Sequence, residues 1–201
     1  MWQAAQARAG AGPSRPTLYL RILFFEFLFL GIVIVGVRLR GASLSTIFGK
    51  RWHSAGEILR DVGLGACLLV AATILASVLG SHEGPAANDA IRYLVPRDAF
   101  ELWLWMAVSL AAGVCEEAIF RGYLQRQFSA LTRSVPVGIV LSAAAFGASH
   151  LYQGWGRAAV IAVPAVLFGW VAHWRKTVRP GMIAHTLQDG LAPLLLKLVR
   201  G

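Results

Sequence analysis

The stretch LYLRILFFEFLFLGIVIVGV, residues 18–37, is a run of 20 residues in which the charged side chains are Arg21 and Glu26. A helix of that length rises about 30 Å, which matches the hydrocarbon thickness of a bilayer. The run lacks the period-2 alternation of a barrel strand, and a backbone in lipid must satisfy its own hydrogen bonds, so a helix is predicted. No small-residue cleavage site follows it. We therefore expect a retained membrane anchor rather than a removed signal peptide.

Five more apolar blocks follow, and hydrophobic residues make up 57% of the 201-residue chain. Charged residues make up 14%, against roughly 25% in soluble domains, and the mean hydropathy is +0.60, which excludes a water-soluble globule. We predict an all-α fold, a polytopic membrane bundle of about six transmembrane helices. The five further blocks cover approximately residues 62–79, 102–131, 135–150, 158–174 and 182–199.

The formal charge of +9 comes from basic residues at the ends of the apolar blocks rather than along one exposed face. That distribution indicates lipid head groups as partners and no nucleic acid. The connections after the first, third and fifth spans hold eleven Lys and Arg residues, against seven on the opposite side, which favours a cytoplasmic location for the first group. We expect an integral, multi-pass protein of the plasma (inner) membrane of a prokaryote.

Three parts of the chain are distinguished. Residues 1–17 have no periodicity and are predicted to be a flexible basic tail. Residues 18–101 are expected to form two N-terminal transmembrane helices with their connections, and residues 102–201 contain the polar motifs described below. Cys67 and Cys115 lie within apolar blocks and form no CxxC or paired framework, so we interpret them as packing residues.

Several ionisable residues lie where a bilayer should exclude them. A charge at the centre of a spanning helix costs about 2.5 to 3.5 kcal/mol, so Glu116, Glu117, Arg121 and Asp189 would together oppose insertion by on the order of 10 kcal/mol if unpaired. Glu117 and Arg121 are four residues apart, a spacing that lets opposite charges meet on a helix. Glu116 points about 100° away from Glu117 and is free to face a polar cavity.

Two further polar positions follow in later blocks. His185 and Asp189 repeat the four-residue spacing, so an imidazole and a carboxylate can share one helix face. His150 ends a run of small residues, 142–149, that permits close approach of a neighbouring helix. Glu117 lies 17 residues before Ser134 and His150 lies 16 after it, both roughly 25 Å away along a helix, so similar depths are expected. The depth of His185 is not fixed by this argument.

These residues carry a resemblance to a known family. Glu116-Glu117-xxx-Arg121, followed by Gly122-Tyr123-Leu124, then Phe146-xxx-His150 and His185-xxx-Asp189, resembles the three ordered motifs of the CAAX-processing and bacteriocin-processing (CPBP, formerly Abi) intramembrane endopeptidases. The likeness covers about residues 102–193 and implies that 102–201 is the catalytic core. The third motif of the family more often ends in Asn than in Asp, and an ionised Asp189 cannot donate a hydrogen bond as an amide can.

The resemblance implies a hydrolase, and the chemistry of peptide hydrolysis agrees with the residues present. The reaction needs a bound water, a base, an oxyanion stabiliser and an acid for the leaving amine. Glu116 is the candidate base, and His150 is expected to position the water or polarise the carbonyl with His185 assisting. Glu117 with Arg121 would support the site. Asp189 would orient His185 or a substrate backbone group.

The metal requirement and the nucleophile stay open. Glu116, His150 and His185 are acceptable zinc ligands in kind and number, yet HExxH is absent. The family is described both as metalloproteases and as glutamate-type proteases, so the cofactor is either a divalent metal such as zinc or none. Ser149 adjoins His150, but adjacent residues on a helix point apart.

The predicted function is an intramembrane endopeptidase that hydrolyses a peptide bond of a membrane-associated protein or peptide by glutamate-activated water, with or without a metal. Prenylated CAAX proteins are one substrate class that the resemblance implies, and peptide maturation is another. The alternatives are a non-catalytic immunity or scaffold protein and a proton-coupled transporter, although no inverted repeat is apparent.

Some residues are given a structural interpretation. Phe146 is expected to pack beside the site rather than take part in the chemistry. Arg21 and Glu26 in the first span are assigned no chemistry. Asp61 is expected at an exposed helix start, at the beginning of the second span.

Overall fold

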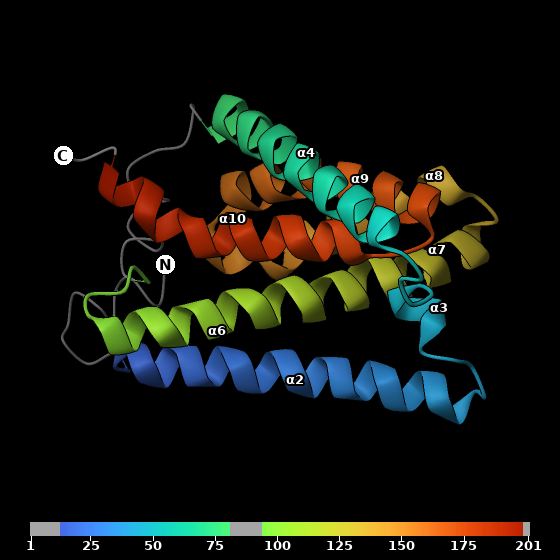
Figure 1. Cartoon of the computed structure of the whole chain (residues 1–201), viewed down its shortest axis with the longest axis horizontal. Helices are drawn as coiled ribbons and strands as arrows, with labels where there is room; N and C mark the ends of the chain where they lie inside the picture. The colour runs from blue at the N-terminus through green and yellow to red at the C-terminus, as the bar shows by residue number, and fades with distance from the viewer. Residues whose placement is uncertain (1–12, 81–93, 199–201) are drawn as a thin grey trace.

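The computed structural model describes residues 13–80 and 94–198, with side chains through residue 193, and within these ranges every regular element is helical. The predicted all-α class is confirmed. In Figure 1 the long helices run side by side, with α2 lying along α6 and α10 between α6 and α4. In chain order the elements are α2 (Arg15–Leu39), α3 (Ser45–Phe48), α4 (Ala55–Gly80), α6 (Ala99–Glu116), η1 (Glu117–Leu124), α7 (Gln125–Thr132), α8 (Val135–Ser149), η2 (Leu151–Gln153), α9 (Trp155–Arg175) and α10 (Arg179–Leu198).

Four helices of the described ranges are long and apolar enough to cross a membrane: α2, α4, the continuous run Ala99–Thr132, and α9. The chain is thus an integral membrane protein. The other two predicted spans correspond to α8, an apolar helix of 15 residues, and α10. Helix α10 carries His185, Gln188 and Asp189 and is not among these four helices.

The two N-terminal helices begin earlier than the apolar pattern indicated. Helix α2 begins at Arg15, with the Ser14 hydroxyl as its N-cap, so the last residues of the predicted tail are helical, whereas residues 1–12 lie outside the described part. Helix α4 begins at Ala55 rather than near residue 62.

The early start of α4 places Asp61 inside the bundle, so the expectation of an exposed helix start is wrong. Asp61 is only 1% exposed. Its Oδ1 accepts hydrogen bonds from Arg175 Nη2 at 2.7 Å and Nε at 3.1 Å, and its Oδ2 accepts one from Trp52 Nε1 at 2.8 Å. This ion pair, in which two Arg175 donors bind one carboxylate oxygen, joins α4 to the end of α9.

The third predicted helix is a continuous 34-residue run, Ala99–Thr132, that contains the π-helical turn η1. Arg133 ends the run with φ of 55°, and α8 begins at Val135. Ser142 Oγ then donates a hydrogen bond to the Phe120 carbonyl at 2.7 Å, which fixes α8 against η1. The turn between α7 and α8 therefore brings the end of α8 back towards the depth of Glu116 and Glu117.

The run of small residues in α8 lies against α9, as the sequence predicted. A Cβ atom on Gly147 would lie 2.6 Å from the Ala158 carbonyl oxygen and 2.6 Å from the Ala162 Cβ. Only glycine leaves room for that approach. The contact brings the start of α9 next to His150, the residue after α8.

Candidate active site

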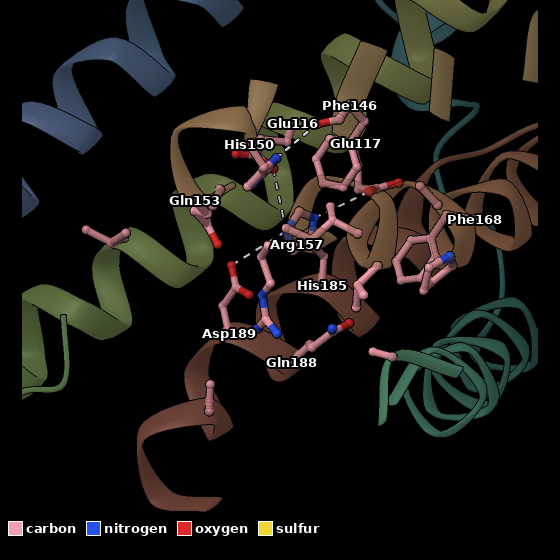
Figure 2. Close-up of a pocket in the computed structure, with 18 of the residues that line it drawn as sticks. Glu116, Glu117, Phe146, His150, Gln153, Arg157, Phe168, His185, Gln188 and Asp189 are labelled. Atoms are coloured by element: carbon pink, nitrogen blue, oxygen red, sulfur yellow. Dashed lines mark hydrogen bonds and ion pairs between the residues drawn. The ribbon is translucent and has the colours of Figure 1, made fainter. Parts of the chain in front are cut away.

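A cavity of about 270 Å³ lies among the helices, and it is lined by residues of α2, α4, α6, η1, α8, α9 and α10. Figure 2 shows the polar side chains converging on it from opposite walls. The six predicted site residues all line this cavity: Glu116, Glu117, Arg121, His150, His185 and Asp189. The three motifs thus meet in one place, although they lie up to 73 residues apart in the sequence, from Glu116 to Asp189.

Glu117 and Arg121 form a buried ion pair, as their spacing predicted. Arg121 Nη1 lies 2.9 Å from Glu117 Oε1, and their side chains are 2% and 1% exposed. The Arg121 guanidinium also lies 4.4 Å from the centre of the Phe146 ring and 5.5 Å from that of Phe168. The faces of the two aromatic rings attract the positive guanidinium group, so they partly replace the water that would otherwise stabilise its charge. The pair therefore ties η1 to α8 and α9.

The backbone of α10 passes close to this ion pair. A Cβ atom on Gly181 would lie 2.6 Å from Glu117 Oε2 and 3.3 Å from Phe168 Cδ1. Glu117 Oε2 is itself buried, and no hydrogen-bond donor of the described residues reaches it. Because glycine has no Cβ atom, Gly181 lets α10 approach the Glu117 carboxylate this closely.

His185 stands between the acidic pair and Asp189. Its Nδ1 lies 3.3 Å from Glu117 Oε1, whereas its Nε2 lies 3.6 Å from Glu116 Oε2 and 3.5 Å from Asp189 Oδ2. The dashed lines of Figure 2 mark these three approaches. Glu117 and Asp189 thus hold opposite edges of the imidazole, and Glu116 faces the same edge as Asp189. The sequence predicts that Asp189 orients His185 or a substrate backbone group, and it does not predict the contact between His185 and Glu117.

His150 is held by the end of α8. Its Nδ1 lies 2.9 Å from the Phe146 carbonyl oxygen and 3.1 Å from Ser149 Oγ. A carbonyl only accepts hydrogen bonds, so this contact assigns the proton of a neutral ring to Nδ1 and leaves Nε2 as an acceptor. The ring is stacked on Tyr152, with centroids 6.1 Å apart. Its second nitrogen is therefore available to a water molecule or substrate.

Ser149 is not placed as a nucleophile. Its hydroxyl donates a hydrogen bond to the Phe146 carbonyl at 2.7 Å, and the residue is exposed and absent from the cavity lining. Phe146 itself lines the cavity and packs on Phe120, with ring centroids 5.1 Å apart, as expected of a packing residue.

Other cavity residues were not identified from the sequence. Polar side chains come from η2, α9 and α10, namely Tyr152, Gln153, Arg157 and Gln188. Glu26 comes from α2 and lines the same cavity as Glu116. The available signal for Glu26 was its presence in a run of lipid-facing aromatic residues, where an ionisable group is costly.

The candidate zinc ligands do not fit a metal site in this geometry. Within the described residues no group of three or more His, Cys, Asp or Glu side chains is arranged to hold a metal ion. His185 Nδ1 is directed at Glu117, and His150 Nδ1 at a backbone carbonyl.

Residues 98–191 match a protein-family model described as type II CAAX prenyl endopeptidase, Rce1-like. The segment is therefore CPBP-like, as the motifs predicted. The match begins at Asp98, the N-cap of α6, and ends within α10, so it contains all three motifs. The CPBP family comprises intramembrane endopeptidases, whereas α2 and α4 lie outside the CPBP-like segment. Searches with the chain match no curated protein and no solved structure.

Proposed function

We propose that this protein is an intramembrane endopeptidase in which Glu116 activates a water molecule for attack on a peptide bond. The observation that carries the proposal is the placement of Glu116. Its neighbour Glu117 is neutralised by Arg121, whereas Glu116 faces the cavity with 17% of its side chain exposed, beside His185. A carboxylate beside a cavity large enough for water can serve as a general base.

The first step forms a tetrahedral intermediate. Glu116 takes a proton from a water molecule whose oxygen attacks the carbonyl carbon of the peptide bond. His150 positions that water, since its Nε2 accepts a hydrogen bond while Nδ1 is bound to the Phe146 carbonyl. His185 Nε2, when it carries a proton, donates to the negative oxygen that forms.

The second step breaks the carbon–nitrogen bond. The proton held by Glu116 passes to the leaving amine, directly or through His185 Nε2 at 3.6 Å. Glu117 and Asp189 keep His185 in place during both steps. The products are a new carboxyl terminus and a new amine, so one water molecule is consumed.

The likeness to a CAAX endopeptidase model and the position of the cavity among apolar helices support a membrane-associated substrate. We propose a membrane-associated polypeptide, with prenylated CAAX proteins and maturing peptides as the two classes, in the plasma membrane of a prokaryote. Metal analysis of the purified chain tests separately whether a divalent ion contributes.

The test compares membrane proteomes of cells that carry the wild-type chain, Glu116→Gln or Glu57→Gln. The two variants make the same chemical change, but Glu57 lies at the start of α4, where it accepts a hydrogen bond from the His53 backbone N–H. The proposal predicts uncleaved precursors with Glu116→Gln alone. If Glu116→Gln keeps the biological activity and no precursor accumulates, the chain is a non-catalytic partner and the proposal fails. Substrate-dependent proton flux in proteoliposomes would instead indicate a transporter.

A further inference from the structure

A proline inside α10 changes the backbone hydrogen bonding beside the site. Pro193 lies within this helix, four residues after Asp189. In a regular α-helix each N–H donates to the carbonyl four positions earlier, and proline has no N–H. The Asp189 carbonyl therefore lacks the donor that a regular helix provides. A backbone acceptor without a donor is costly in a membrane bundle, because lipid supplies no hydrogen bonds.

A side chain of α6 supplies a donor to this carbonyl. Trp105 Nε1 donates a hydrogen bond to the Asp189 carbonyl oxygen at 3.0 Å, although the two residues are 84 positions apart. An indole N–H only donates, so the direction of the bond is fixed. Trp105 and Asp189 both line the cavity. A contact between helices thus replaces the hydrogen bond that Pro193 removes from within α10.

The Trp105 ring is itself held by α2. The Tyr19 ring packs edge-on against it, with centroids 5.7 Å apart, and Tyr19 is fully buried. The Tyr19 hydroxyl donates to the Leu94 carbonyl at 2.7 Å, which fixes the orientation of that ring. Trp103, two residues earlier on α6, is by contrast 76% exposed. Trp105 is therefore an internal residue of the bundle, whereas Trp103 faces its surroundings.

Helices α6 and α10 also approach closely on the other side of His185. A Cβ atom on Gly113 would lie 2.8 Å from the Thr186 backbone nitrogen and 3.0 Å from the Met182 carbonyl oxygen. This approach fixes the part of α10 near Thr186, and the Trp105 hydrogen bond fixes the next turn. The two contacts together determine how α10 presents its polar side chains to the cavity.

We propose that Trp105 is a positioning residue: its indole N–H replaces the donor that Pro193 removes, and so holds Asp189 at the wall of the cavity. Asp189 Oδ2 lies 3.5 Å from His185 Nε2, so the placement of this turn also fixes the imidazole. The inference rests on the proposed function, in which His185 donates to the oxyanion. Loss of the indole donor should lower the rate of the chemical step and leave substrate binding nearly unchanged.

The kinetic test uses the full chain in proteoliposomes with a precursor peptide identified by the proteome comparison. Trp105→Phe keeps an aromatic ring against Tyr19 but removes the N–H. We expect kcat per folded molecule to fall about tenfold with KM nearly unchanged. Trp103→Phe, the same change at an exposed position of α6, should keep the wild-type rate. A wild-type kcat for Trp105→Phe, or a change in KM alone, would overturn the proposal.

A second variant separates the lost donor from the altered ring contact. Pro193→Ala provides an N–H at position 193 that can donate to the Asp189 carbonyl. In the Pro193→Ala background, Trp105→Phe should therefore lower kcat by less than about twofold, against about tenfold in the wild-type background. If Trp105→Phe alone does not fold, the double variant should restore folded protein. An equal loss in both backgrounds would contradict the inference.

A spectroscopic test does not depend on proteolysis. Infrared difference spectra of the membrane-embedded chain, wild type minus Trp105→Phe, should show an indole N–H stretch lowered by hydrogen bonding. A stretch at the frequency of a free indole would contradict the inference. If the stretch is lowered but Glu116→Gln is fully active, the proposed function fails and the positioning role with it, although the contact itself stands.

Discussion

His185 Nδ1 lies 3.3 Å from Glu117 Oε1, although the two residues are 68 positions apart in the sequence. The contact joins α10 to the helix that carries the acidic pair, and it places one carboxylate oxygen against both an imidazole and a guanidinium group. Glu117 Oε1 also lies 2.9 Å from Arg121 Nη1. Glu117 therefore orients the imidazole, and in the proposed mechanism Glu116 remains free to act as the base.

Gly181→Ala should damage the site without removing any polar group. The new methyl would lie 2.6 Å from Glu117 Oε2, so the carboxylate or α10 must move. We expect a loss of about 1 to 3 kcal/mol in the free energy of unfolding and a lower cleavage rate. Gly31→Ala is the matched control, since its Cβ would have no described atom within 4 Å. Equal stability and activity of both variants would contradict the close approach.

Replacing one partner of the buried ion pair should lower the free energy of unfolding more than replacing both partners. Glu117→Gln leaves the buried Arg121 charge without its partner, and we expect a loss of about 3 to 5 kcal/mol in the free energy of unfolding. The double variant Glu117→Gln, Arg121→Met should recover part of that loss. Denaturant unfolding in detergent measures both. Additive effects would show that the two side chains do not interact.

Asp189→Asn should be tolerated. The amide oxygen can still accept a hydrogen bond from His185 Nε2, which lies 3.5 Å from Asp189 Oδ2. We expect a cleavage rate within about tenfold of the wild type, because only one contact of the imidazole is weakened. Asp189→Leu, which removes the acceptor, should lower the rate further. If Asp189→Asn were as inactive as Asp189→Leu, the negative charge itself would be required.

Asp61→Asn should affect folding but not chemistry. Asp61 binds Arg175 and Trp52 and is absent from the cavity lining. The variant leaves the Arg175 guanidinium without its carboxylate partner, which should lower the free energy of unfolding by about 3 kcal/mol or more. The rate per folded molecule should stay unchanged. A reduced kcat in folded protein would show that this ion pair acts on the site.

The apolar blocks predicted the helical class and the position of most helices, because a helix that crosses a membrane needs a run of apolar side chains. The spacing of Glu117 and Arg121 also predicted their ion pair correctly. The start of α4 was missed, since its first turns carry polar residues and lie outside the apolar block. Asp61 consequently appeared exposed, and its partner Arg175 lies 114 residues away, beyond any local pattern.

The contribution of α2 could not be read from the sequence for a different reason. Its residues are apolar around the whole circumference, so no amphipathic pattern indicates which face meets α6. The rotation that directs Glu26 into the cavity is set by Tyr19 and Leu30 against their partners. Long-range packing therefore determines which side chain of α2 reaches the cavity.

The most direct test of the account measures cleavage of one identified precursor peptide by the reconstituted chain, comparing wild type, Glu116→Gln and Glu57→Gln. A general base contributes about 10²- to 10⁴-fold, so Glu116→Gln should lose at least about a hundredfold in kcat while Glu57→Gln keeps the wild-type rate. A Glu116→Gln variant that cleaves the peptide at the wild-type rate would contradict the proposed mechanism.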